Sequence, residues 1–329
     1  LVGGILACLL CHALPSLASA PATRPGLSAT EIVTNKCWIF THLQKSGGTT
    51  VKKILALKWG LKFKIYDSSQ WKEGDAFSHR FGKILATGNE WNVIAGGYPE
   101  ALRRTTVVEN NCRWFTMFRH PVSRLVSAFF YCRSHPGDQL CARKEINVRN
   151  MDLVTFAKHW GNYALRQFAL SIVPADAVID HLVSKTGRDV EEYYIKATPG
   201  WYLLKLYLED QAEASKYGEI PDAALYDMLP LAQDLLRDSY AAVGILEEFN
   251  TTLSLFDAAL EIPGMDWQAE FQSGGKKRSV DAADVAEEAD TLAEAWTNSD
   301  IKRFMHLDLQ LYEHAVHVFN QQKKLYDLE

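Results

Sequence analysis

The feature that most constrains the fold is a β-rich apolar run that leads directly into a glycine turn and then into a helical pattern. The run covers residues 37–43 (CWIFTHL), the turn covers 44–48 (QKSGG), and the helical pattern covers 49–57. A strand that ends in such a turn and opens a helix points unpaired backbone N–H groups and the positive end of the helix dipole at one place. The pattern therefore favours an α/β fold with an anion site at the carboxyl end of the first strand.

Further strand-like runs alternate with helical stretches along the chain. The runs are residues 93–97 (VIAGG), 113–118 (RWFTMF) and 240–246 (YAAVGIL), and a long last helix is expected at about 299–325. A few strands alternating with helices predict a parallel sheet with helices on both faces. Residues 21–35 are rich in Pro, Ser and Thr and read as a stem or linker, so we expect one domain over residues 36–329.

Two loops carry the residues suited to bind anions. The first offers a cation, two glycines that allow close approach of the backbone, and hydroxyl donors: Lys45, Ser46, Gly47, Gly48, Thr49 and Thr50. Lys45 precedes the glycines, whereas in the ATP-binding loop the lysine follows them. The second loop follows the strand at 113–118 and offers Arg119, whose planar guanidinium matches phosphate oxygens, and Ser127 in the helix that Pro121 opens. Together the loops predict a ligand with separated anionic groups.

The segments KSGGTT (45–50) and RHPVSRLVS (119–127) resemble the paired signatures of sulfotransferases that use 3′-phosphoadenosine 5′-phosphosulfate (PAPS). They are most similar to the Golgi carbohydrate O-sulfotransferases of the heparan 2-O- and chondroitin type. The resemblance implies a P-loop-NTPase-like sulfotransferase fold and PAPS as co-substrate, with no metal at the nucleotide. It also implies that the first loop grips the 5′-phosphosulfate, and that Arg119 and Ser127 grip the 3′-phosphate.

The implied reaction is transfer of a sulfuryl group to a hydroxyl of a glycan acceptor. Three alternatives stay open: a tyrosyl-protein sulfotransferase, a small-molecule sulfotransferase, and a glycan-binding relative without turnover. A nucleotide kinase is a further rival, against which the position of Lys45 argues.

The expected catalytic residues are Lys45 and a general base. Lys45 is placed to stabilise or protonate the bridging oxygen of the leaving phosphate. Many relatives carry Gly-His after a strand some 50 residues past the lysine, but this chain has Gly96-Gly97 there. Glu100, three residues on, is the first choice for the base, and His79 is the second.

The N-terminus predicts the secretory route. Residues 1–14 are almost wholly apolar and residues 15–20 are mostly small, as in a secretory signal peptide, although a truncated signal anchor of a type II membrane protein in the Golgi stays open. Asn250 begins an N-x-T glycosylation sequon. Cys132 and Cys141 flank a turn that a disulfide could close, and adjacent parallel strands could bring Cys37 and Cys112 together.

The charge balance argues against nucleic acid as a partner. The chain has 35 Lys and Arg against 40 Asp and Glu, which gives a formal net charge of −5. No global basic field exists to hold nucleic acid, so any bound anion needs a local site. The oligomeric state cannot be read from the sequence.

Overall fold

The computed structural model describes residues 37–59, 64–65, 92–96, 112–136, 141, 148–172, 225–226, 228–274 and 282–328. Within them, five strands form one sheet in the order β2-β3-β1-β4-β5, and every neighbouring pair is parallel. The strands are β1 (Cys37–Thr41), β2 (Lys64–Ile65), β3 (Asn92–Gly96), β4 (Cys112–Phe118) and β5 (Tyr240–Ile245). The predicted parallel α/β sheet is confirmed. Only β2, two residues long, gave no signal in the sequence.

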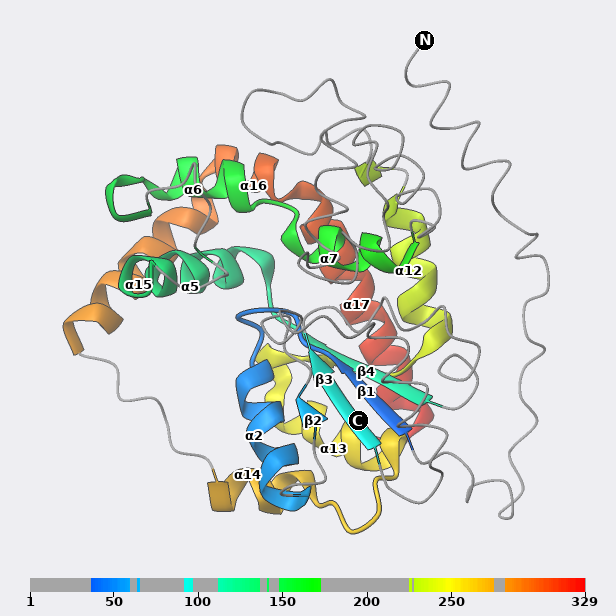
Figure 1. Ribbon diagram of the computed structural model, residues 1–329. Coiled ribbons are helices and arrows are strands. Elements are labelled where there is room, and N and C mark those ends of the chain that lie inside the picture. The colour runs from blue at the N-terminus through cyan, green and yellow to red at the C-terminus, as the bar shows by residue number, and fades with distance from the viewer. Residues whose placement is uncertain are drawn as a thin grey trace, which may run out of the picture.

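Helices flank this sheet and form a second layer beyond its carboxyl edge (Figure 1). In Figure 1, α2, α13 and α14 lie on one side of the strands, and α7, α12 and α17 lie on the other. The helices are α2 (Gly48–Trp59), α5 (Pro121–Ser134), α6 (Leu153–Trp160), α7 (Tyr163–Ile172), α12 (Met228–Ser239), α13 (Phe249–Leu260), α14 (Trp267–Gly274), α15 (Ala282–Thr297), α16 (Ser299–Phe304) and α17 (His306–Leu325). Short 3₁₀ turns lie at Val148–Asn150 and Leu246–Glu248.

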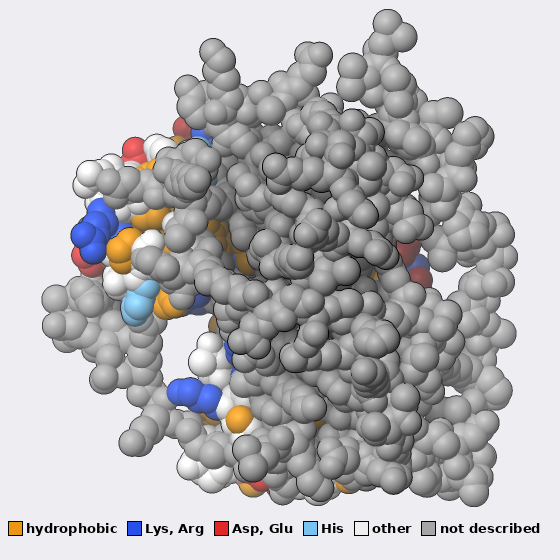
Figure 2. All heavy atoms as spheres, viewed as in Figure 1, with side chains coloured by type: hydrophobic (Ala, Val, Ile, Leu, Met, Phe, Trp, Pro, Cys, Tyr) orange, Lys and Arg blue, Asp and Glu red, His pale blue; other side chains and the backbone are white. Residues whose placement is uncertain are grey.

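The described residues bury two apolar clusters. The larger surrounds the sheet and includes Phe40 and Phe115, whose ring centroids are 5.0 Å apart. The smaller lies between α5, α6, α15 and α16 and includes Phe156 and Trp160, whose rings stack at 5.6 Å. Lys and Arg side chains reach the surface beside α2 and at the outer end of α5 and α15 (Figure 2). The second cluster fixes α5, the helix that the second anion loop opens.

The prediction of a single helix at about 299–325 is wrong in one respect, because the helix is interrupted at Met305. Met305 has φ −108° and ψ 6°, and α17 starts afresh at His306. The side-chain oxygen of Asn162 accepts the backbone N–H groups of Leu307 and Asp308, at 3.0 and 3.1 Å. This amide comes from a residue 145 positions away, so the periodicity of the helix itself could not reveal it.

Three of the four cysteines named from the sequence are disulfide-bonded. Cys132 and Cys141 are joined by a disulfide, with their Cα atoms 5.2 Å apart. Cys112 is also disulfide-bonded, and Cys37 lies directly opposite it on the neighbouring strand. Asn250 is exposed in the first turn of α13, as a glycosylation acceptor must be.

The expected signal segment (1–20) and linker (21–35) lie outside the described residues. Among the residues that the structure does describe, no helix combines the length and the apolar character needed to cross a membrane.

Candidate active site

The two predicted anion loops meet at the carboxyl edge of the sheet. They follow β1 and β4, which are neighbours in register from Cys37 opposite Cys112 to Thr41 opposite Thr116. A guanidinium nitrogen (Nη1) of Arg119, at the end of β4, donates a hydrogen bond to the backbone carbonyl of Lys45 at 3.3 Å. The two cationic residues therefore belong to one site.

The first loop reaches its shape through two residues in the left-handed region. Lys45 has φ 65° and Gly47 has φ 79°. A Cβ atom at Gly47 would lie 2.5 Å from the Cε atom of Met117 and 2.8 Å from the Cδ1 atom of Leu246. At Gly48, where α2 begins, a Cβ atom would lie 1.8 Å from the Cδ2 atom of His42. The Gly-Gly pair is thus required by conformation at the first position and by close packing at the second.

His42 is a member of the site that the sequence did not single out. Its ring is buried, packs on Phe40 at a centroid distance of 6.0 Å, and fills the space beside Gly48. Burial, then the positive charges of Lys52 and Lys45, lowers its pKa to about 3. At neutral pH His42 is therefore an uncharged support beneath the loop.

The hydroxyls of the first loop differ in their surroundings. Ser46 is 1% exposed, and its Oγ atom has no hydrogen-bond partner among the residues that the structure describes. Thr50 is half-buried and Thr49 is exposed at the start of α2. A buried hydroxyl without a partner costs free energy unless a ligand satisfies it. Ser46, beside a helix N-terminus and Lys45, is therefore suited to an anionic ligand.

The ammonium group of Lys45 contacts a tyrosine of the second loop's helix. Its Nζ atom lies 4.2 Å from the centroid of the Tyr131 ring, on α5. Ser127 is half-buried one helical turn before Tyr131, so the two side chains share a face of α5. The face of α5 that bears Ser127 is therefore the face that Lys45 contacts.

The second loop is ordered by its own cap and by a carboxylate. The ring Nδ1 atom of His120 accepts the backbone N–H of Val122 at 3.3 Å, which caps α5. One carboxylate oxygen of Glu247 accepts the backbone N–H of His120 at 2.8 Å, and the other accepts the Tyr312 hydroxyl at 3.2 Å. Glu247 follows β5, so three neighbouring strands end at this site. The sequence did not reveal that Glu247 orders the second loop.

Electrostatics leave Arg119 available for an anion. Burial lowers the pKa of Arg119, and the carboxylates of Glu247 and Glu288 oppose that shift. An arginine keeps its charge at neutral pH in either case. Burial likewise lowers the pKa of the neighbouring His120, again opposed by Glu247. His120 is thus mainly uncharged at neutral pH, and its ring packs on Trp296 at 4.0 Å.

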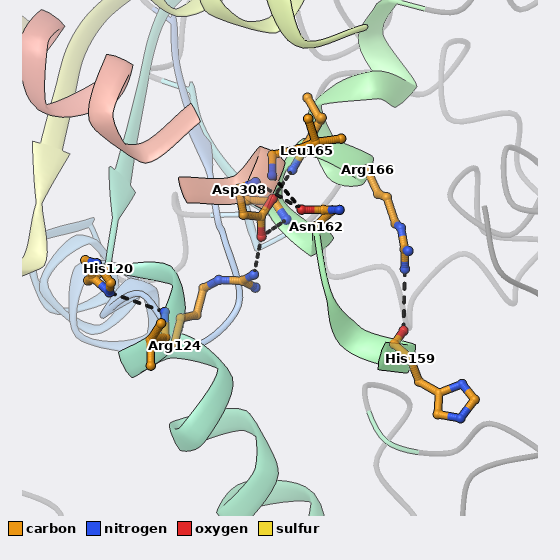
Figure 3. Close-up of polar contacts among 10 residues, drawn as sticks. His120, Arg124, His159, Asn162, Leu165, Arg166 and Asp308 are labelled. Carbon is orange, nitrogen blue, oxygen red and sulfur yellow. Dashed lines mark hydrogen bonds and ion pairs between the residues drawn. The ribbon is translucent and has the colours of Figure 1, made fainter. Parts of the chain in front are cut away.

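The second arginine of the loop, Arg124, pairs with a carboxylate inside the protein. It is 1% exposed and forms a buried ion pair with Asp308 of α17 at 2.7 Å. The same carboxylate accepts the backbone N–H groups of Ala164 and Leu165, at 3.1 and 2.9 Å, at the start of α7. Figure 3 shows Arg124 of α5 and Asp308 of α17 converging with Asn162, which lies in the turn just before α7. This cluster, the Arg124–Asp308–Asn162 node, fixes α5 relative to α7 and α17.

A comparison with protein families decides the class of this site. The sequence profile described as "Sulfotransferase family" matches residues 34–320. The chain belongs to the sulfotransferase family. A search among curated proteins found no match. Membership of this family supports sulfuryl transfer as the general activity of the chain, and the fold is the sulfotransferase fold.

The two candidates for the general base, Glu100 and His79, lie outside the described residues and stay predictions. The assignments of Lys45, Arg119 and Ser127 to particular phosphate groups also stay predictions, although the structure brings these residues together. Within the described part of the chain, no group of three or more His, Cys, Asp and Glu side chains is arranged to hold a metal ion.

Proposed function

We propose that this sulfotransferase transfers the sulfuryl group of PAPS to a hydroxyl of a glycan in the Golgi lumen. The observation that carries the nucleotide part is the contact between Arg119 and the Lys45 carbonyl, at 3.3 Å. It joins two cationic loops at the ends of adjacent strands, and a donor with phosphate groups at both its 3′ and 5′ positions needs two such loops.

The residues of the first loop suit the 5′ end of the donor. Lys45, Ser46 and Gly47 directly precede Gly48, the first residue of α2, whose N-terminus favours an anion. The Ser46 hydroxyl has no hydrogen-bond partner in the described part of the chain, and Gly47 has a positive φ. PAPS would supply an activated sulfuryl group there. Lys45 would stabilise the charge that builds on the leaving phosphate, and Arg119 with Ser127 would hold the 3′-phosphate.

The proposed acceptor and compartment rest on other features. The paired segments 45–50 and 119–127 resemble those of the Golgi carbohydrate enzymes, which supports a glycan acceptor. The Cys132–Cys141 disulfide and the signal-like residues 1–20 support the oxidising secretory pathway. A membrane anchor formed by the N-terminal segment belongs to the same proposal.

The test is transfer of radiolabelled sulfate from PAPS to a panel of heparan and chondroitin glycans, tyrosine peptides and phenols. We expect label on a glycan, and a much slower transfer with the Lys45→Ala variant. Label on peptides or phenols alone would overturn the proposed acceptor. PAPS binding without transfer to any member of the panel would indicate a binding protein without turnover.

A further inference from the structure

Two contacts of Lys45 lie within the described residues: one with Arg119 of the second anion loop, and one with Tyr131 farther along α5. The backbone carbonyl of Lys45 is held by Arg119, and its ammonium lies 4.2 Å from the ring centroid of Tyr131. Lys45 is a non-glycine residue with φ 65°, so its backbone needs support from its surroundings. The Arg119 bond gives that support to the peptide, and the Tyr131 ring constrains the end of the flexible side chain.

We propose that Tyr131 is a positioning residue for Lys45, acting through the face of its ring. This inference rests on the proposed function. An ammonium over an aromatic face is attracted by the ring quadrupole, most strongly where both groups are partly withdrawn from water. Lys45 and Tyr131 are both half-buried. The four-carbon stem of a lysine otherwise samples many rotamers, so the ring reduces the entropy lost when the ammonium meets the leaving phosphate.

The surroundings of Tyr131 keep its ring in place. The Tyr131 ring stacks on the ring of His135, just past the end of α5, with 4.6 Å between the centroids and 14° between the planes. The next residue, Cys132, is buried and bonded to Cys141, which fixes that end of the helix. Tyr131 thus offers Lys45 a ring held by both a stacking partner and a covalent cross-link.

The test compares Tyr131→Phe with Tyr131→Leu in the full chain. Phenylalanine keeps the aromatic face, so we expect the kcat of sulfuryl transfer to stay within about twofold of the unmodified protein. Leucine fills similar space without a quadrupole, so kcat should fall about three- to thirtyfold while KM for the donor changes less. Tyr226→Leu, at an exposed tyrosine on the segment before α12, is the matched control and should behave as the unmodified protein. Equal losses for Phe and Leu, or no loss with Leu, would overturn the proposal.

A double-mutant cycle separates positioning from mere stability. On a Lys45→Ala background, Tyr131→Leu should cause no further loss of kcat, because the group that it positions is gone. An additional loss equal to that seen with Lys45 present would mean that Tyr131 acts on the fold and would overturn the proposal.

A second readout needs no activity. Reductive methylation with labelled formaldehyde introduces an NMR probe on lysine amines, and Lys45→Arg identifies the Lys45 signal. The ring of residue 131 should shift that signal upfield in the unmodified protein and in Tyr131→Phe, but not in Tyr131→Leu. A Lys45 signal that is the same in all three proteins would refute the contact. If the Lys45 signal shows the expected upfield shift but the protein neither binds PAPS nor transfers sulfate, the result counts against the proposed function alone.

Discussion

At the scale of single residues, His42 is the least expected part of the site. The ring is buried against Gly48 and Phe40, and burial together with Lys52 and Lys45 lowers its pKa to about 3. An unfolded histidine titrates near pH 6.5, so between these values the unfolded chain binds one more proton than the folded chain. The stability from a neutral His42 is fully present above pH 6.5 and is lost as the pH falls towards 3.

The pH dependence of the unfolding free energy, measured in urea, should differ between the unmodified protein and His42→Gln, whose side chain cannot take up a proton. Between about pH 6.5 and pH 5, the unmodified protein should lose up to about 2 kcal/mol more unfolding free energy than the variant. Other titrating groups are common to both proteins and cancel in the difference. Parallel curves over this range would show that His42 is not held neutral by the fold.

Gly48 is the partner of that histidine. A Cβ atom there would lie 1.8 Å from the His42 ring, so Gly48→Ala must displace the ring or the start of α2. We expect a loss of about 1–3 kcal/mol of unfolding free energy, measured by urea denaturation, together with weaker donor binding. The same change on a His42→Ala background should cost clearly less, because the clash is removed. An equal cost on both backgrounds would disprove the steric explanation.

At the scale of elements, the Arg124–Asp308–Asn162 node joins helices that are far apart in the sequence. Asp308 pairs with Arg124 of α5 and caps the start of α7, while Asn162 caps the start of α17 in return. α5 carries Ser127 and Tyr131, so the node holds the site's second loop through its helix.

Removing the carboxylate should be costly. Asp308→Ala leaves the Arg124 cation buried without its partner and uncaps α7, so the unfolding free energy should drop by about 3–5 kcal/mol. Asp238→Ala, which breaks the exposed pair with Arg237, is the matched control and should stay within about 0.5 kcal/mol. Chemical denaturation of both variants makes the measurement. A loss with Asp308→Ala no larger than the control's would mean that the node contributes nothing to the fold.

At the scale of the whole molecule, local patterns predicted β1, β3, β4, β5 and the two anion loops, but not the tertiary contacts between them. The run at 37–43 contains β1, and the run at 113–118 covers all of β4 except its first residue, because a buried parallel strand is continuously apolar. No local sequence pattern predicted β2, the break at Met305, or the burial of Arg124. Each depends on a partner distant in the chain: β3 for β2, Asn162 for Met305, and Asp308 for Arg124.

Of the site itself, residues 45–50, Arg119 and Ser127 were predictable because their types match an anion's chemistry in a recognisable order. His42, Glu247 and Tyr131 were not, because they act through contacts that only the packing of β1, β5 and α5 creates. The loop residues that the sequence indicates are therefore held in place by residues whose roles no local pattern reveals.

We propose that Lys45 and Arg119 hold opposite ends of one nucleotide. Calorimetric titration with 3′-phosphoadenosine 5′-phosphate and with adenosine 5′-monophosphate, which lacks the 3′-phosphate, tests it most directly. One charge-assisted hydrogen bond is worth roughly 1.5–3 kcal/mol, or about 10- to 150-fold. The unmodified protein and Lys45→Ala should therefore prefer the first nucleotide at least about tenfold, and Arg119→Ala should lose that preference. If Arg119→Ala keeps the preference for the 3′-phosphate, Arg119 does not hold that end of the nucleotide.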